Sequence, residues 1–250
     1  MNDSEPAVLA ESTHWVALGK PAGWLTHPDG RTNAPALSEW FVAKYPEAAG
    51  VGEPQRTLAG EEIARPGVVH RLDRDTTGVV LLARTAEGYD HLKRAFAERL
   101  AGKRYRAFAW GNIVENEMTI RLPIGRARGD FRKKSASAKA RGETREAETR
   151  VAVLARIVDG GEHLVFIEAE PVTGRTHQIR AHLAAVHHPV VGDKLYAPGR
   201  SDALGFSRLA LHALRISFPD LDGARREIEA PYPADFAAAV QTFVDSDTGR

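Results

Sequence analysis

Residues 68–80 constrain this chain more than any other stretch, because they place charged residues between two apolar pieces that are typical of strands. The apolar pieces cover residues 66–69 and 79–82. The polar residues between them are Arg71, Asp73, Arg74, Asp75 and Thr76. Charged side chains are rarely buried unless they are paired. A surface turn of mixed charge would explain these residues, and so would a strand that ends at a functional site.

Composition places the chain among ordinary globular proteins and excludes several other classes. Of its 250 residues, 43% are hydrophobic, 27% are charged and none is cysteine. Without cysteine there is no disulfide framework and no thiolate metal site. No apolar run reaches the roughly 18 residues of a membrane span, so we expect no membrane attachment. The acidic first residues lack the basic start and long apolar stretch of a signal peptide, and we expect a cytoplasmic protein.

The net charge of +1 hides an uneven distribution along the chain. Residues 101–150 carry thirteen Lys and Arg against six Asp and Glu, a net of +7. Residues 1–65 and residues 219–250 each have a net charge of −4. This asymmetry favours a polyanionic partner for the middle of the chain. A solvated basic loop would give the same count, so the charge does not decide the question alone.

Apolar periodicity predicts strands and helices without the regular alternation of a parallel α/β protein. Strands are expected at 14–18, 79–83, 103–110, 149–155, 162–170 and 208–218. Helices are expected at 35–45, 86–101, 177–187 and 233–244, with Thr85 as the N-cap of the second. Residues 1–12 are expected to be flexible, and residues 126–148 to form a basic loop or a loosely held hairpin. This mixture predicts an α+β fold.

Three residues are candidates for catalytic chemistry. Asp73 can act as a nucleophile if it stays ionised, and that requires a cationic neighbour. Arg175 is a candidate for this neighbour, because it follows a Thr-Gly turn just before a predicted helix. Tyr105 lies among cations on a predicted strand, where its ring can stack on an unstacked base. Two of them also have an ordinary structural explanation: Arg175 taken alone would be a surface arginine, and Tyr105 would be a residue of the sheet core.

Residues 73–77 also match D-x-D-x-T, the pattern in which haloacid-dehalogenase-type phosphatases carry a nucleophilic aspartate, an acid/base aspartate and magnesium. The pattern has three fixed positions, and its chemistry needs a long apolar strand where this chain has His70 and Arg71. His177 and His182 are five residues apart, which is not the spacing of a zinc helix, so no metal site is expected. Besides the phosphatase, the sequence leaves open a non-catalytic RNA-binding or chaperone protein.

Several motifs, in the same order along the chain, resemble those of the RluA-type family of RNA pseudouridine synthases. The matching residues are 20–23 (K-P-x-G), 70–78 (H-R-L-D-x-x-T-[ST]-G), 103–107 (K-x-Y-x-A), 174–180 (G-R-[ST]-H-Q-[IL]-R) with His182 and Gly192-Asp193, and 211–213 and 230–233 near the C-terminus. The matches span residues 20–236, nearly the whole chain, so chance is a poor explanation for them.

The resemblance implies a pseudouridine-synthase-like fold, with a mixed, mainly antiparallel sheet flanked by helices and loops around a central active-site cleft. Residues 13–245 would form the catalytic domain, with no N-terminal RNA-binding domain of the kind found in some relatives. Asp73 would be the catalytic aspartate, Tyr105 would lie against the target base, and Arg175 would be the basic partner of Asp73. The RNA-binding residues would be Arg71, Arg74, Lys103, Arg104, Arg106, Lys133, Lys134, His177 and Arg180.

The implied activity is isomerisation of a specific uridine in structured ribosomal or transfer RNA to pseudouridine. The N1–C1′ bond breaks, the uracil turns and C5 joins C1′, without redox change or group transfer, so no cofactor is expected. The cleavage resembles the first step of retaining glycoside hydrolysis, in which a carboxylate stabilises or captures positive charge at the anomeric carbon. Attack on C1′, attack on C6 and removal of a sugar proton all remain open for Asp73. RNA is the expected partner of a monomeric enzyme.

Overall fold

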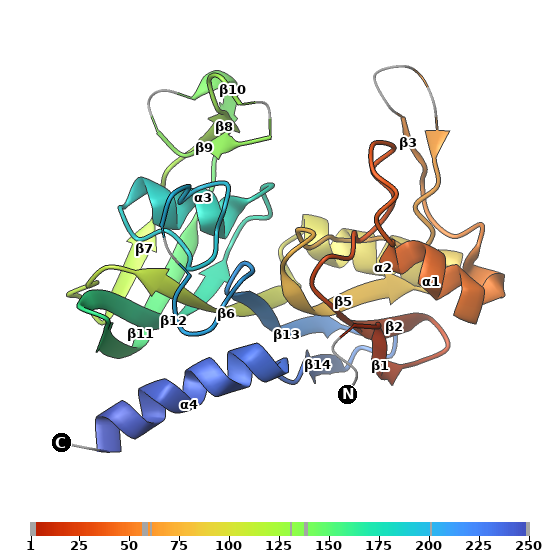
Figure 1. Ribbon diagram of the computed structural model, residues 1–250. Helices are drawn as coiled ribbons and strands as arrows, with labels where there is room; N and C mark the ends of the chain where they lie inside the picture. The colour runs from red at the N-terminus through yellow and green to blue at the C-terminus, as the bar shows by residue number, and fades with distance from the viewer. Residues whose placement is uncertain are drawn as a thin grey trace. The chain divides into compact units, whose positions relative to one another are not determined.

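A computed structural model describes residues 4–56, 60, 62–130, 132–137, 140–200 and 202–248, which divide into two compact units (Figure 1). Unit 1 contains the described residues up to Lys103 together with Ala213–Pro231. Unit 2 contains Arg104–His212 and the described residues from Tyr232 onward. The chain passes between the units three times, within the strands β6 (Gly102–Trp110) and β13 (Leu211–Pro219) and again after Pro231.

The sheet of unit 1 forms around a fully buried strand, β5 (Thr77–Ala83). An unbroken apolar run of this kind suits a strand that is covered on both faces. On one side of β5 are β2 (Trp15–Lys20) and β1 (Ala7–Glu11), and on the other are β13 and β14 (Arg225–Glu229). The pairs β1–β2, β2–β5 and β13–β14 are antiparallel.

Two helices of unit 1, α1 (Leu37–Lys44) and α2 (Ala86–Ala97), lie on the same side of β2 and β5 (Figure 1). Thr85 caps α2 as the sequence predicts, since its hydroxyl accepts a hydrogen bond from the Gly88 N–H at 3.1 Å. The connection between β2 and β5 also contains three short elements. They are the 3₁₀ helix Pro46–Ala48 and the paired strands β3 (Gln55–Arg56) and β4 (Glu62–Ile63).

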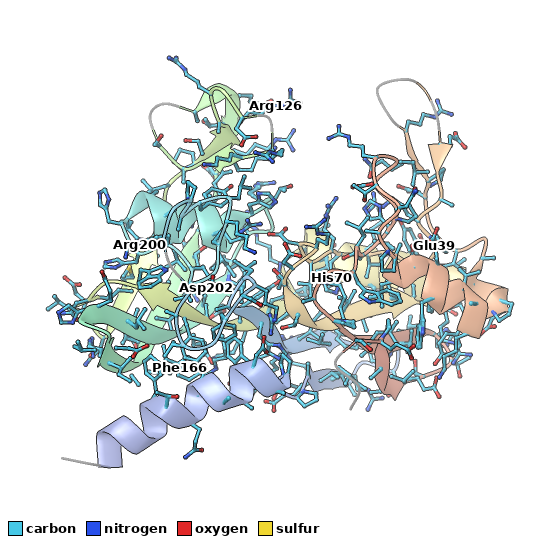
Figure 2. All side chains as sticks on the ribbon, viewed as in Figure 1. Glu39, His70, Arg126, Phe166, Arg200 and Asp202 are labelled. Atoms are coloured by element: carbon cyan, nitrogen blue, oxygen red, sulfur yellow. The ribbon has the colours of Figure 1, made fainter. Side chains whose placement is uncertain are left out.

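The sheet of unit 2 has the order β6, β12 (Glu162–Pro171), β11 (Thr149–Asp159) and β7 (Glu117–Ile120), with antiparallel neighbours throughout. The helices α3 (Gln178–Ala185) and α4 (Ala234–Thr248) lie on opposite sides of it (Figure 1). Aromatic rings fill the α4 side, where Phe166 of the sheet lies beside the helix (Figure 2). The clustered rings are Phe108, Phe166, Phe206, Phe236 and Phe243.

The basic segment after residue 121 forms a second, smaller sheet of unit 2. It consists of β8 (Ile124–Arg126), β9 (Lys134–Ser135) and β10 (Arg141–Arg145), in the order β10-β8-β9. Ile124, Ala136 and Ala147 form a buried cluster with Ala181 of α3. Charged strands of two to five residues carry little apolar periodicity, and for this reason the sequence suggested only a loop or a loose hairpin.

The α+β prediction is confirmed, and each of the four expected helices is present. Residues 7–11 were wrongly included in a flexible segment, because pairing with β2 orders them as β1; residues 1–3 of that segment lie outside the described part of the chain. The apolar piece at 66–69 contributes only one bridge, between Val68 and Leu82. None of the helices within the described residues has both the length and the apolar character needed to cross a membrane.

Candidate active site

Asp73 lies in the loop that leads into β5, and the residue before it is held through its backbone. The Thr26 hydroxyl accepts a hydrogen bond from the Leu72 N–H and donates one to the Leu72 carbonyl, each at 3.1 Å. Thr26 and Leu72 are both buried. The carbonyl of Asp73 itself accepts from the Thr76 N–H at 3.2 Å, which closes a turn. One hydroxyl thus fixes the backbone on the N-terminal side of Asp73.

Lys20 and Gly23, from the K-P-x-G turn, hold the backbone on the other side of Asp73. The Lys20 ammonium donates to the carbonyls of Pro21, Trp24 and Arg74, each at 2.8 Å. The Gly23 N–H also donates to the Arg74 carbonyl, at 3.0 Å. Lys20 is only 2% exposed, and its three carbonyl partners offset the cost of burying a charge. The turn therefore orders the loop that carries Asp73.

His70 anchors the start of this loop to β5. Its Nε2 accepts a hydrogen bond from the Leu81 N–H at 2.9 Å, and its ring stacks on Phe96 with centroids 4.7 Å apart. Burial, and secondarily the charge of Lys103, lowers the pKa of His70 to about 3. His70 is therefore neutral at physiological pH and acts as a structural acceptor rather than as a cation for RNA.

The glycine that ends the H-R-L-D signature has a steric role. Gly78 has φ +115°, a backbone conformation that side chains disfavour. A Cβ at this position would lie 2.2 Å from the Ala213 carbonyl oxygen. Only glycine lets β5 and β13 approach this closely.

The basic residues expected to bind RNA in unit 1 differ in their exposure. Arg71 and Arg74 are exposed, and Arg74 pairs with Asp75 at 3.3 Å. Lys103 is partly buried over the Phe96 ring, and desolvation lowers its pKa. Arg71 and Arg74 are thus accessible at the surface, whereas Lys103 packs within the protein.

Tyr105 and its two neighbouring arginines lie on opposite faces of β6, because side chains alternate along a strand. Tyr105 is 9% exposed and lies opposite Ala169 of β12. Arg104 and Arg106 both form ion pairs with Glu168, and the Arg106 guanidinium also lies over the Phe166 ring at 5.8 Å. This geometry favours a structural role for Arg104 and Arg106 over the RNA contact expected from the sequence.

The G-R-T-H-Q-I-R run is ordered by a buried polar network centred on Gln178. The Gln178 Oε1 accepts from the Arg175 N–H at 3.0 Å and from the Thr173 hydroxyl at 2.7 Å. Its Nε2 donates to the Glu148 carbonyl at 2.9 Å and to the Thr149 hydroxyl at 3.1 Å. A buried side-chain amide stabilises the fold only when its oxygen and nitrogen have hydrogen-bond partners, as they do here. The network fixes the backbone at Arg175.

The network continues through His182, which is completely buried. Its ring nitrogens lie 2.8 Å from the Thr149 hydroxyl and 2.8 Å from the Leu122 carbonyl. Burial lowers the pKa of His182. His182 therefore acts as a neutral connector from α3 to β11 and to the segment that joins β7 and β8.

Arg175 and Arg180 have different environments. The Arg175 Nε donates to the Glu146 carbonyl at 3.1 Å, and no ion pair of this residue is found among the described residues. Arg180 is 11% exposed and forms a bidentate pair with the fully buried Asp193 carboxylate, at 2.7 and 2.9 Å. Bidentate pairing fixes the plane of a guanidinium. Arg180 is thus the more rigidly held of the two arginines.

Tyr196 connects the small basic sheet to the G-R-T-H-Q-I-R run. Its hydroxyl lies 2.9 Å from the amide nitrogen and 3.2 Å from the carbonyl oxygen of Lys134. The same hydroxyl lies 3.3 Å from the His177 Nδ1, and the Arg180 guanidinium lies over the Tyr196 ring at 5.1 Å. The Lys133 ammonium is 6.0 Å from that ring. Four of the predicted RNA-binding residues therefore gather around one tyrosine.

Sequence reasoning gave no role to Thr26, Gln178, Asp193 or Tyr196. Lys20 and Gln178 lie within recognised motifs, yet their function in holding backbone depends on contacts between distant segments. The only local indication of this support was Lys20, which lies at the end of an apolar strand and needs partners if it is buried. Tyr196 carried no signal of its own.

No group of three or more His, Asp or Glu side chains suited to holding a metal ion is found in the described part of the chain. Asp75, the second aspartate of the D-x-D-x-T match, is paired with Arg74.

Comparison with known proteins gives the family. Residues 14–185 match the RNA pseudouridylate synthase family. The chain belongs to this family. It is 34% identical over 205 residues to the dual-specificity RNA pseudouridine synthase RluA of Pasteurella multocida, covering 82% of this chain and 83% of that protein.

A second relative, an uncharacterised RNA pseudouridine synthase of Synechocystis, is 35% identical over 230 residues. This match covers 92% of the chain but 66% of the relative, so the chain spans about two thirds of the length of that protein. The human RNA pseudouridylate synthase domain containing 1 has the same fold, with a TM-score of 0.74, 22% identity and coverage of 100% of this chain and 97% of its own. The predicted RluA-type family and pseudouridine-synthase fold are confirmed, and the phosphatase alternative is not favoured.

Proposed function

We propose that this chain isomerises a uridine in RNA to pseudouridine, with Asp73 as the catalytic carboxylate. The observation that carries the proposal is the double support of the Asp73 loop, by Thr26 on one side and by Lys20 and Gly23 on the other. A solvated surface turn has no need of a buried lysine bonded to three carbonyls. A catalytic group needs such support, because small displacements from the productive geometry cost large factors in rate.

The reaction is balanced within the uridine. The N1–C1′ bond breaks, the C5–C1′ bond forms, the proton leaves C5 and one proton is taken up at N1. Asp73 stabilises or captures the positive charge that develops at C1′, as a carboxylate does in retaining glycoside hydrolysis. The uridine leaves its stack to reach this carboxylate, at a cost of a few kcal/mol.

Arg175 is the candidate for the cation beside Asp73, and its backbone is fixed by Gln178. Replacing Arg175 by Lys keeps the positive charge but not the planar fork of donors. Arg175→Lys should lower kcat, and an unchanged kcat would reject Arg175 as the partner of Asp73.

The basic residues of unit 2 bear on the kind of RNA that the chain binds. Lys133, Lys134, His177 and Arg180 gather around Tyr196, which supports a phosphate-binding surface on unit 2. We propose structured ribosomal or transfer RNA in the cytoplasm as the substrate of a monomeric catalytic domain over residues 13–245. Size-exclusion chromatography with light scattering tests the monomer, and a dimeric mass would reject it.

The test of the central proposal compares Asp73→Asn with Asp75→Asn. Both substitutions remove one carboxylate from the same loop, so they match in charge and size. Release of tritium from RNA labelled at C5 of uridine follows the reaction directly, because the C5 proton leaves when C5 joins C1′. Asp73→Asn should abolish tritium release while its RNA affinity stays within about twofold of wild type. Asp75→Asn should still release tritium. Detectable turnover by Asp73→Asn would reject the assignment.

A further inference from the structure

Three basic residues of unit 1 gather beside the loop that carries Asp73: Arg65, Arg71 and His27. The Arg71 Nη1 lies 3.5 Å from the His27 Nε2, at the outer limit of a hydrogen bond. Burial, and secondarily the charge of Arg71, lowers the pKa of Arg65, and the charges of both arginines act on His27. The Arg71 guanidinium therefore meets His27, and Arg65 lies near enough for its charge to act on the same histidine.

The protein does not neutralise this pair of guanidinium groups. Neither Arg65 nor Arg71 forms an ion pair with a carboxylate of the described residues, and the Arg65 Nε is buried without a hydrogen-bond partner. Two carboxylates act on this group by charge, Asp29 on His27 and Glu53 on Arg65, but both are bonded to other partners. Asp29 accepts the Arg31 and Thr32 N–H groups at 2.9 Å, and Glu53 pairs with Lys93. Like charges held together without a counterion raise the energy of the folded chain.

His27 suits a neutral positioning role between the arginines. It is 5% exposed, and its Nδ1–H donates to the Pro28 carbonyl at 2.7 Å. This leaves the Nε2 lone pair to accept from Arg71. Burial, assisted by the Arg65 and Arg71 charges, lowers the pKa of His27 to about 4, so the ring adds no third charge at physiological pH. His27 also follows Thr26, whose hydroxyl holds Leu72.

We propose that Arg65 and Arg71 together bind one phosphodiester group of the RNA, with neutral His27 orienting Arg71. An oxyanion supplies the missing counterion, and guanidinium forks match phosphate oxygens. Arg71 is two residues from Asp73, so the bound phosphate belongs to a nucleotide next to the target uridine. This placement rests on the proposed function, whereas the anion site itself does not.

Inorganic phosphate is the first probe of the anion site. Phosphate should raise the Tm of the wild-type chain above that measured in chloride at equal ionic strength, because a ligand that binds only the folded state stabilises it. Arg65→Gln should lose this increment, and without phosphate it should be as stable as wild type or more stable, because like-charge repulsion is removed. Arg94→Gln, an exposed arginine of α2, is the control and should keep the increment. An Arg65→Gln chain that keeps the full increment overturns the proposal.

A stem-loop RNA that the wild-type chain modifies is the second probe. Neutral methylphosphonate groups, introduced one position at a time around the uridine, should weaken wild-type binding about tenfold at one phosphate. At that phosphate, the substitution should have little further effect on Arg65→Gln or Arg71→Gln, because all three changes remove the same contact. If the effects of the methylphosphonate and of either arginine substitution on binding add fully at every position, the proposal of a shared phosphate site is wrong. If the wild type forms no pseudouridine in any RNA, the proposed function fails, and the phosphate measurement still tests the arginine pair.

Discussion

Thr26→Val should destabilise the protein and slow catalysis together, although Thr26 is expected to touch no substrate. Valine has nearly the same shape but removes a hydroxyl that makes two hydrogen bonds to Leu72, each 3.1 Å long. Each bond contributes about 1 kcal/mol net, and a buried N–H left without a partner costs about 1–3 kcal/mol. The expected loss is therefore about 2–4 kcal/mol of unfolding free energy. In a chain of this size that corresponds to a Tm lower by roughly 5–15 °C.

Thr76→Val is the matched control on the same loop. Thr76 is also buried, but its hydroxyl has no hydrogen-bond partner among the residues that the structure describes, so valine should leave stability unchanged or raise it by about 1 kcal/mol. Urea unfolding compares the two variants, and single-turnover tritium release measures the chemical step. Thr26→Val should lower that rate tenfold or more with RNA affinity within about twofold, and Thr26→Ser should restore most of it. Equal stability of Thr26→Val and Thr76→Val would refute the argument.

Further predictions concern Tyr105, the basic sheet and His70. Tyr105→Phe keeps a ring for stacking but loses the hydroxyl, whereas Tyr105→Leu loses both. If Tyr105→Phe is more than about tenfold more active than Tyr105→Leu, the role of Tyr105 is stacking. If both variants lose the same activity, its role is proton transfer. Replacing Lys133 and Lys134 by Gln should reduce the slope of log affinity against log salt by about 1–2 units, and an unchanged slope would remove them from the RNA interface. Because the pKa of His70 is about 3 folded and near 6.5 unfolded, the unfolded chain binds the extra proton as pH falls. Stability should therefore drop between pH 7 and pH 5, and His70→Gln should make this drop smaller by roughly 1–2 kcal/mol; the rest comes from His27 and His182, whose pKa values burial also lowers.

Long apolar runs and helical periodicity were sufficient to predict most of the large elements. The buried strand β5 and the helix α2 with its Thr85 cap follow from local sequence. Strand β1 and the small basic sheet do not, because their order comes from pairing with β2 and from packing on α3. Short polar strands are stabilised by partners that are distant in sequence, and no local pattern shows them.

The site was predictable in its residue types and only partly in their roles. Motif order identified Asp73, Tyr105 and the G-R-T-H-Q-I-R run, and the family match supports that reading. The sequence could not show that Arg104 and Arg106 share Glu168, because this depends on the register of β6 against β12. Nor could it show that Thr26 and Lys20 support the Asp73 loop, which requires segments about 50 residues apart to meet.

Comparative mapping of pseudouridines tests the central claim most directly. Total RNA from cells that contain the chain is compared with RNA from cells that lack it and from cells that contain only Asp73→Asn. The account predicts that one or a few uridines in structured RNA are modified only when the intact chain is present. It also predicts that Asp73→Asn gives the same map as the deletion. Identical maps from all three kinds of cell, or full modification with Asp73→Asn, would contradict it.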